Sequence, residues 1–419
     1  MCKWSAKQQS AATTRTTEKD SRSHDDDNDA RRPIPILSEI IYFPVILLSA
    51  TFHYLLHPWP QLEATVAMAV MGGFFGFLLI PTAFAYCLTI LMETIFGISP
   101  MILSYAVWIP FSILYAVQIL ILDKTHVHVR NSGPPQPRYS LERAAWAFAD
   151  SIWKYYPSVE CIPCDWEEDD NDSDNTKDTA PTTTNGTSSL PFTLDPNQQI
   201  IFGVHPHGIH CIPLGQFTAK DSAFDRTFPG LYGPKLTGIC ATVIFKLPVV
   251  RELFFHMGYI DASRSVCQEA MQQGQSLFIC VGGEEEAMYT TKGQDIVVLS
   301  KRKGFVRLAL RYGASLVPVF GVGNTDTYET YSIGLKWRLW LQKKTGIALP
   351  IFHGRWFSTL PYPVPIKLLV GEPILTPTPV PGGGGKPDDA LVEEYHAKYV
   401  EALKKMHSKY VTDRTLIVK

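Results

Sequence analysis

Charge is scarce in this chain. Only 19% of its 419 residues are Asp, Glu, Lys or Arg, which is below the ~25% of ordinary soluble domains. The 38 basic and 40 acidic residues nearly cancel, and they form no basic stripe of the kind that binds nucleic acid. Hydrophobic residues make up 46% of the chain, which excludes a disordered protein. The composition therefore indicates a folded chain rich in apolar residues and argues against nucleic-acid binding.

A regular cysteine framework is also missing. The 8 cysteines show no repeated spacing, and Cys161 and Cys164 form a single CxxC pair. A zinc ribbon needs a second such pair, which the sequence lacks. We interpret Cys161 and Cys164 as two unpaired, reduced thiols near the surface.

The N-terminal region lacks the features of a cleaved secretory signal. No apolar segment follows Lys3, as such a signal requires. Residues 1–33 are instead rich in Ser, Thr, Asp and Gln. This composition predicts a disordered tail.

Two long runs contain no charged residue. They are Ala64–Met92 and Thr94–Leu122, with Glu93 between them. As a helix, each run is long enough to cross the ~30 Å hydrocarbon core of a bilayer. We therefore predict a transmembrane hairpin at about 64–122.

The basic residues around this region predict its orientation. Arg31 and Arg32 precede the apolar region 34–122 and Lys124 follows it, whereas no Lys or Arg lies within it. Basic flanks on both sides favour two cytosolic ends, and this arrangement needs an even number of crossings. We therefore expect the first apolar segment, 34–57, to lie in the membrane interface.

The rest of the chain divides into three parts. Residues 123–164 have the pattern of an amphipathic juxtamembrane segment, and residues 165–190 form an acidic insert that we expect to be disordered. Residues 191–419 alternate short apolar runs with helical patterns. This alternation predicts a mixed α/β domain on the cytosolic side, so the fold class is α/β behind a membrane-anchored helical hairpin.

Within that domain the apolar runs predict particular elements. We expect a helix over Arg302–Tyr312, ended by Gly313, and a last helix from about Pro387. The expected strands are Ile200–Val204, Leu277–Val281, Leu316–Phe320 and Ile366–Val370.

Histidines follow the first of these strands directly. His205, His207 and His210 have the HxHxxH spacing of dinuclear metallohydrolases, but Ile209 occupies the place where such sites have an Asp. The same histidines could be solvated loop residues. They could also supply a general base, because a neutral imidazole can take the proton of an attacking alcohol. Backbone N–H groups near Gly208 would then be candidates for stabilising the oxyanion. The spacing leaves these alternatives open.

Two further motifs favour acyl transfer. Gly282 and Gly283 precede a cluster of glutamates that ends at Glu286, after another strand, and provide further N–H groups for the oxyanion. The motif 301–305 places three cations at a helix start, where free N–H groups also attract anions. A phosphate-bearing acyl donor fits this second motif.

Together these residues resemble the type-2 diacylglycerol acyltransferase family, which includes monoacylglycerol and wax-alcohol acyltransferases. The resemblance covers about Leu37–Tyr410 apart from the acidic insert. The matching motifs are Tyr155-Tyr-Pro157, His205-Pro-His-Gly208, Phe228-Pro-Gly230, Gly282-Gly-Glu-Glu-Glu-Ala287, Arg302-Lys-Gly-Phe305, Leu308-Ala-Leu-Arg-Tyr-Gly313, Leu316-Val-Pro318 and Gly371-Glu-Pro-Ile374.

The resemblance implies an acyl-CoA-dependent enzyme that esterifies diacylglycerol to triacylglycerol, with a glycerolipid-acyltransferase-like fold. It implies acyl-CoA as co-substrate without a further cofactor or metal, and it is compatible with a homo-oligomer. It also implies a multi-pass protein of the endoplasmic reticulum membrane and of lipid droplets, with both termini cytosolic. The alternatives are a monoacylglycerol or long-chain-alcohol acyltransferase, a membrane metallohydrolase that uses the HxHxxH loop, and a non-enzymatic lipid-droplet scaffold.

The resemblance also assigns roles to residues. His205 or His207 is the base, and His205 is favoured because it aligns with the His of the wider H-x4-D motif, whose Asp is replaced here by His210. Glu286 is the expected partner that orients the base. The implied substrate-binding residues are Pro206, Gly208, Gly282, Gly283, Lys301, Arg302, Lys303, Gly304, Phe305 and Asn324. The family usually has Phe-Gly-Glu-Asn where this chain has Gly321-Val-Gly-Asn324, so the acceptor pocket is expected to differ.

Overall fold

The computed structural model describes the α/β domain and a short helical segment before it. The described residues are 50–66, 147, 151–165, 190–233, 235–246, 251, 254, 257–346, 348–377 and 385–419. The predicted tail (1–33) and nearly all of the predicted hairpin (64–122) and acidic insert (165–190) lie outside them. Across the described residues, no helix is both long enough and apolar enough to span a bilayer.

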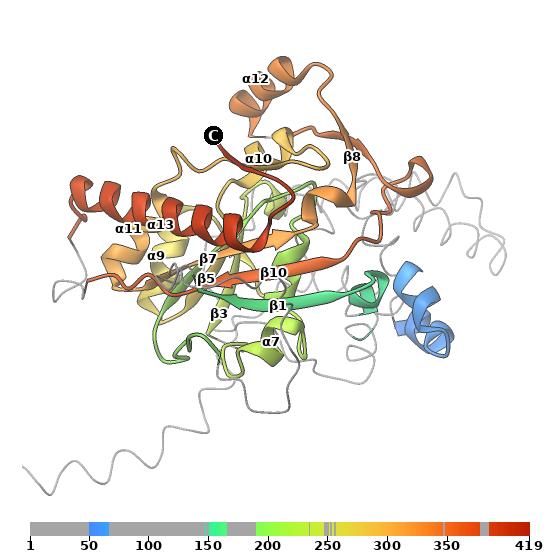
Figure 1. Ribbon diagram of the computed structural model, residues 1–419, viewed down its shortest axis with the longest axis horizontal. Helices are drawn as coiled ribbons and strands as arrows, with labels where there is room; N and C mark the ends of the chain where they lie inside the picture. The colour runs from blue at the N-terminus through green and yellow to red at the C-terminus, as the bar shows by residue number, and fades with distance from the viewer. Residues whose placement is uncertain are drawn as a thin grey trace, which may run out of the picture. The chain divides into compact units, whose positions relative to one another are not determined.

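A seven-stranded sheet forms the centre of the domain, in the order β1-β10-β7-β2-β5-β3-β4 (Figure 1). From β7 to β4 the strands run parallel, whereas β10 and β1 run antiparallel to β7. Two small sheets, β8–β9 and β6–β11, accompany it. The strands are β1 (Val159–Cys164), β2 (Ile200–His205), β3 (Leu236–Cys240), β4 (Ile260–Asp261), β5 (Ser276–Cys280), β6 (Asp295–Val297), β7 (Ser315–Val322), β8 (Glu329–Tyr331), β9 (Ile351–His353), β10 (Ile366–Gly371) and β11 (Leu416–Val418).

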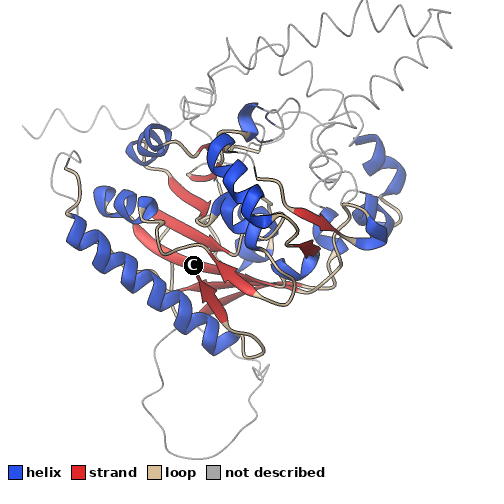
Figure 2. Cartoon of the chain, turned by 90° about the horizontal axis from the view of Figure 1, so that it is seen from above, coloured by secondary structure: helices blue, strands red, loops and turns tan. Residues whose placement is uncertain are grey.

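Helices connect the strands and cover the sheet (Figure 2). The α-helices are α7 (Ala223–Thr227), α9 (Arg264–Gln272), α10 (Gly283–Tyr289), α11 (Gly304–Tyr312), α12 (Leu335–Thr345) and α13 (Asp389–Tyr410). The 3₁₀ helices are η4 (Ser151–Tyr155), η5 (Ile212–Phe217), η6 (Ile244–Lys246), η7 (Asn324–Thr327) and η8 (Arg355–Phe357).

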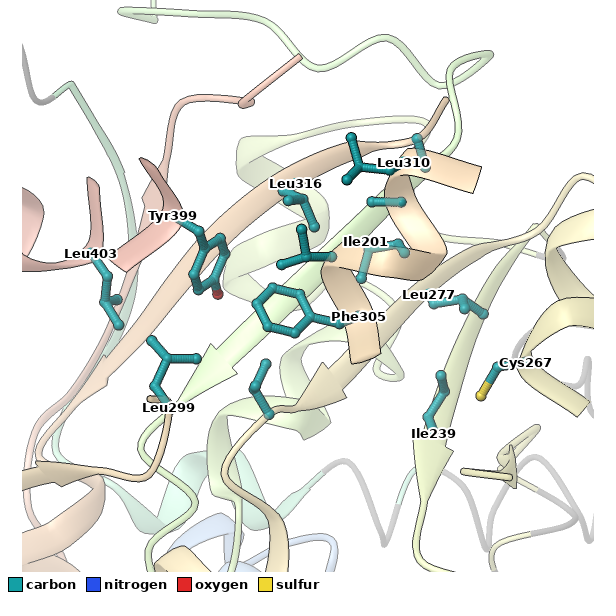
Figure 3. Packing of buried hydrophobic residues seen from close by; sticks show 14 of the residues in the cluster. Ile201, Ile239, Cys267, Leu277, Leu299, Phe305, Leu310, Leu316, Tyr399 and Leu403 are labelled. Atoms are coloured by element: carbon teal, nitrogen blue, oxygen red, sulfur yellow. The ribbon is translucent and has the colours of Figure 1, made fainter. Parts of the chain in front are cut away.

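The central strand β2 is buried along its whole length. Its side chains alternate between two apolar clusters, because successive residues of a strand point to opposite faces of the sheet. Ile201 packs with α9, α11 and α13 on one face, where Tyr399 and Phe305 lie side by side (Figure 3). Phe202 packs with Phe217 and Phe224 on the other face. Strands buried on both faces read as continuous apolar runs, which is why this strand could be predicted from the sequence.

The predicted elements of the domain are confirmed. The four predicted strands correspond to β2, β5, β7 and β10 with ends shifted by up to two residues, and the predicted helices to α11 and α13. Gly313 ends α11 with a φ of +67°, in the left-handed region that glycine adopts at low cost. The mixed α/β fold class is therefore confirmed, and the hairpin stays a prediction.

One boundary differs from the prediction. β1 pairs with β10 over its full length, from Val159 to Cys164, so the sheet includes residues that we assigned to the juxtamembrane segment 123–164. Cys164 is buried within this strand and Cys161 is half-buried, so neither thiol is the surface group that we expected. The mixed burial of β1 produces no alternating apolar pattern, and its place in the sheet depends on a partner more than 200 residues away.

The C-terminal residues form part of the structure. β11 pairs in parallel with β6, and Lys419 donates its N–H to the carbonyl of Val297 at 2.8 Å. The carbonyl of Lys419 accepts hydrogen bonds from the N–H groups of Leu299 and Ser300, both at 2.9 Å. Two of these partners, Val297 and Leu299, adjoin Val298.

Candidate active site

Three loops meet at the carboxyl end of the parallel strands. β2 ends at His205, β5 ends shortly before Gly282, and β7 ends shortly before Asn324. These strands are neighbours in the sheet, so their following loops lie together, at the edge where open α/β sheets bind ligands. The predicted histidine and glycine–glutamate motifs are thus brought into one site.

Asn324 holds the histidine loop by its backbone. Its Nδ2 donates to the carbonyl of Pro206 at 2.9 Å and to the carbonyl of His207 at 3.1 Å. Gly208, at a φ of +63°, lies so close that a Cβ atom there would be 2.6 Å from Nδ2 of Asn324. The His205–Pro206 peptide bond is cis. Asn324 therefore fixes the path of the loop.

Glu286 holds the same loop from the other side. Its carboxylate is fully buried on α10 and accepts the N–H of His207 with Oε1 and the N–H of Val298 with Oε2, the latter at 2.6 Å. Burial raises the pKa of Glu286 to about 7, against the effect of these hydrogen bonds and of Arg302. In the described part of the chain Glu286 bonds to no imidazole, so it positions the loop through the backbone instead of orienting a ring as we expected.

Gly282 makes room for that carboxylate. A Cβ atom at Gly282 would lie 1.9 Å from Oε2 of Glu286. The adjacent Gly283 has a φ of +58° with open space around it. The glycine pair of the motif is therefore explained by the approach of Glu286 and by the turn that starts α10.

The imidazole of His205 is fully buried against Tyr399. The hydroxyl of Tyr399 donates to the carbonyl of Gly203 at 3.0 Å and lies 3.2 Å from Nε2 of His205. A phenol has one hydrogen, and a carbonyl can only accept. The Tyr399 oxygen therefore accepts the proton on Nε2, and the lone pair of neutral His205 resides on Nδ1. Burial lowers the pKa of His205 to about 3, so this ring is neutral at physiological pH.

Tyr399 was not identified from the sequence as a residue of the site. It comes from α13, and its ring packs edge-on against Phe305 with 4.8 Å between the ring centroids. The Tyr399 hydroxyl can take this place because Gly203 has no side chain: a Cβ atom at Gly203 would lie 2.0 Å from the Tyr399 oxygen. A glycine inside an otherwise apolar, buried strand is the one sequence signal of this close approach.

His207 and His210 are both half-buried, whereas His205 is fully buried, and Nε2 of His210 is itself a buried atom. The Nδ1 of His207 lies 2.9 Å from the carbonyl of Gly208. Because a carbonyl accepts, Nδ1 carries the proton and Nε2 carries the lone pair. Burial lowers the pKa of His207, although the bond to Gly208 opposes this shift.

His210 lies between aromatic rings. It meets Tyr328 and Phe352 edge-on, with centroid distances of 5.3 and 6.0 Å. Burial lowers the pKa of His210 to about 3, and the nearby His207 adds to this shift. The ring is thus packed into the wall of the site, next to the β8–β9 sheet.

The three histidines of the loop do not converge on one point. In the described part of the chain, the side chains that could jointly hold a metal ion are His53, His57 and Glu63, whose ligand atoms lie within 4.8 Å of one another. This group precedes the α/β domain in the sequence and involves no residue of the HxHxxH loop.

The cationic motif lies beside the glycine pair. Arg302 donates to the carbonyl of Gly282 at 3.4 Å and to Glu285 at 2.9 Å, and Lys303 pairs with Glu393 of α13. Lys301 is exposed. The motif continues into α11, whose first two residues are Gly304 and Phe305. Two of the three cations therefore have carboxylate partners, which an anionic ligand would have to replace.

The family model described as "Diacylglycerol acyltransferase" matches residues 189–417, the part of the chain that holds the parallel strands and the histidine loop. The protein is therefore an acyltransferase with an α/β domain. The chain belongs to the diacylglycerol acyltransferase family.

Its relatives include acyltransferases with different acceptors in their names. The chain is similar to 2-acylglycerol O-acyltransferase 3 of Homo sapiens, at 32% identity over 78% of this chain and 88% of the relative. It is similar to diacylglycerol O-acyltransferase 2A of Umbelopsis ramanniana, at 31% identity over 72% and 78%. Diacylglycerol O-acyltransferase 2 of Homo sapiens is 36% identical over 51% of this chain and 56% of that relative. No solved structure gives a significant match.

Proposed function

We propose that the protein transfers the acyl group of an acyl-CoA to the free hydroxyl of diacylglycerol, forming triacylglycerol. Membership of the diacylglycerol acyltransferase family supports the reaction class. Among the relatives, one name refers to 2-acylglycerol and others to diacylglycerol, so monoacylglycerol is the second acceptor to test, followed by a long-chain alcohol.

The observation that carries the catalytic proposal is the lone pair on Nε2 of His207. The bond from Nδ1 to Gly208 places this lone pair on Nε2, in a residue that is half-buried. The sequence favours His205 as the base, but that ring is fully buried and its pKa of about 3 makes it a weak proton acceptor. We therefore assign the base to His207 and a supporting role to His205, held by Tyr399.

The reaction needs one proton transfer in each direction. Nε2 of His207 takes the proton of the acceptor hydroxyl while its oxygen attacks the thioester carbonyl carbon. The C–S bond then breaks, and the CoA thiolate leaves and recovers the proton from the imidazolium. We assign the stabilisation of the oxyanion to backbone N–H groups at Gly208 and Gly282, since such donors lower the barrier when they are fixed in place.

The donor is proposed to bind at the cationic motif. The phosphates of acyl-CoA suit Lys301, Arg302 and Lys303 at the N-terminal end of α11, where unpaired N–H groups also favour anions. Binding there would exchange the carboxylate partners of Arg302 and Lys303 for phosphate oxygens. Exposed ion pairs are weak, at about 0–1 kcal/mol each, so this exchange costs little.

The location follows from the acceptor. Diacylglycerol resides in membranes, and the uncharged runs within 64–122 would anchor the enzyme there. We propose a protein of the endoplasmic reticulum membrane and of lipid droplets, with both termini cytosolic.

The test is an acyl-transfer assay with the purified full-length protein in detergent. Labelled acyl-CoA is offered with diacylglycerol, monoacylglycerol or a fatty alcohol, and diacylglycerol is expected to give the highest kcat/KM. His207→Ala is expected to lower kcat by about 10²- to 10⁴-fold, the usual contribution of a general base. The exposed Ser408 of α13 supplies the control, Ser408→Ala, which should keep full turnover.

Three results would overturn parts of this proposal. A higher kcat/KM for another acceptor would change the substrate. Full turnover of a folded His207→Ala variant would refute the base. Activity that is abolished by a chelator and restored by zinc would favour the metallohydrolase chemistry that the HxHxxH spacing allows.

A further inference from the structure

Large apolar side chains are exposed on the segment between β7 and β10. Trp337 and Trp340 of α12 are 60% and 55% exposed, and Trp356 and Phe357 of η8 are 74% and 85% exposed. Ile333, just before α12, is also exposed. We call these five residues the aromatic patch. They come from two elements of one segment, three from α12 and the chain just before it and two from η8. Large apolar side chains that gather on an exposed surface mark an interaction site.

The segment that carries the patch is held together from inside. The guanidinium of Arg338 is buried within it and donates to the carbonyls of Tyr331 at 2.7 Å, Ile333 at 2.9 Å and Leu349 at 3.0 Å. Arg338 thereby ties α12 to the end of β8 and to the chain before β9. Figure 1 shows that α12 lies away from the central sheet. The aromatic side chains are therefore exposed on a segment whose backbone is held by the hydrogen bonds of Arg338.

The backbone at the tip of the segment is also unusual. Trp356 and Phe357 have φ values of +53° and +54°, in the left-handed region that non-glycine residues rarely adopt. Two consecutive residues of this kind persist only where the surroundings impose them, and they concentrate at functional sites. The two most exposed rings of the patch thus sit on a strained turn.

The charge of the segment has one sign. Residues 332–358 contain Lys336, Arg338, Lys343, Lys344 and Arg355, and no Asp or Glu. Arg338 is buried and Arg355 is half-buried, whereas the three lysines are exposed. Indole rings with an apolar body and a polar N–H, flanked by lysines, match the region between headgroups and acyl chains of a bilayer. Lysines there also attract anionic lipids.

The same segment touches the histidine loop. Phe352 of β9 packs on His210 with 6.0 Å between ring centroids, and Tyr328 packs on the same ring at 5.3 Å. A surface that rests in the bilayer would therefore adjoin the loop that carries His207. An apolar acceptor could reach the site from the membrane without crossing water.

We propose that the aromatic patch inserts into the headgroup region of a phospholipid bilayer that contains anionic lipid, and that it delivers the lipid acceptor to the histidine loop. The second part rests on the proposed acyl transfer. The first part needs no activity and can be tested alone.

The experiment places a spin label on the patch in the full-length protein. Phe357→Cys is made in a background with Cys2→Ser and Cys87→Ser. The other six cysteines, Cys161, Cys164, Cys211, Cys240, Cys267 and Cys280, remain. Burial raises the pKa of Cys161, Cys164 and Cys267 to about 12 and also raises the pKa of Cys240 and Cys280, which suppresses the labelling of these five thiols. The unsubstituted background gives the residual signal. The matched control is Ser408→Cys on an exposed turn of α13. Both proteins are reconstituted in nanodiscs of phosphatidylcholine with phosphatidylserine.

Collision with two relaxing agents reports the surroundings of each label. The Phe357→Cys label is expected to be relaxed by oxygen, which concentrates in lipid, and protected from a water-soluble nickel complex. The Ser408→Cys label should show the reverse. Omitting phosphatidylserine should shift the Phe357→Cys label towards water, because the lysines lose their partners.

Two outcomes overturn the insertion. If nickel reaches both labels equally, the patch lies in water. If both agents are excluded from the Phe357→Cys label, protein covers the patch, either another part of this chain or a second copy. Acyl transfer is measured in the same nanodiscs. Full transfer with a water-exposed patch refutes this inference alone, and an inserted patch without transfer refutes the proposed function alone.

Discussion

Replacing Tyr399 by Phe tests how His205 is held. A neutral imidazole carries one N–H, and Nε2 of His205 has the Tyr399 hydroxyl as its partner, whereas Nδ1 has none among the described residues. Without the hydroxyl, one buried N–H stays unpaired whichever nitrogen carries the proton. An unpaired buried polar group costs about 1–3 kcal/mol. Tyr399→Phe should therefore destabilise the domain by about 2 kcal/mol, which lowers Tm by about 4–8 °C for a domain of this size.

A second substitution isolates the contact. Gly203→Ala alone would place a Cβ atom 2.0 Å from the Tyr399 oxygen, and such overpacking costs about 1–3 kcal/mol. Once Tyr399 is Phe, that oxygen is gone and the nearest remaining ring carbon lies 2.9 Å away. The double variant should thus be more stable than the sum of the single effects by about 1 kcal/mol or more, as expected of residues in direct contact.

The assay is thermal unfolding of the detergent-solubilised protein, followed by intrinsic fluorescence at one scan rate. Tyr395→Phe is the control, because Tyr395 lies one turn earlier on α13 and its ring meets Lys398 at the protein surface. Its Tm should equal that of the wild type. An unchanged Tm for Tyr399→Phe would refute the stabilising contact between the Tyr399 hydroxyl and His205, and strictly additive effects of the two substitutions would refute the close approach of Tyr399 to Gly203.

Three further predictions concern the loop. Gly282→Ala, whose Cβ would meet the Glu286 carboxylate at 1.9 Å, should cost about 1–3 kcal/mol in unfolding experiments; an unchanged Tm would contradict the packing described. Asn324→Ala removes the two hydrogen bonds to the loop carbonyls and should lower kcat in the acyl-transfer assay. An unchanged kcat would show that the loop keeps its shape without these bonds. The proposed base, His207, must be neutral to accept a proton, and its pKa is lowered from 6.5. As the pH is decreased, kcat/KM should therefore fall only below pH 6.5. A loss of kcat/KM that already begins above pH 6.5 on the acid side would exclude His207 as the base.

Much of the sheet could be predicted from local patterns. β2, β5 and β7 are apolar runs because both faces of the sheet are covered, and Gly313 ends α11 with the left-handed conformation that its residue type favours. β1 could not be predicted, since its burial is mixed and its position is fixed by β10. The antiparallel direction of β10 is likewise set by distant partners.

The candidate site shows the same division. The histidine loop, Glu286 and Asn324 all follow strands that are neighbours in the sheet, so their convergence follows from the topology. The contacts between these residues do not follow from the topology. Glu286 is held by hydrogen bonds from the N–H groups of His207 and Val298, and Tyr399 contacts His205 although 194 positions separate them in the sequence.

The C-terminal strand has a practical consequence for protein engineering. Lys419 is hydrogen-bonded to the residues on either side of Val298, whose own N–H is bound by Glu286. A fusion partner or purification tag appended at this end, or a deletion of 416–419, would disturb the segment that helps Glu286 to hold the histidine loop. Reporter and affinity sequences attached at the other terminus leave these hydrogen bonds of Lys419 in place.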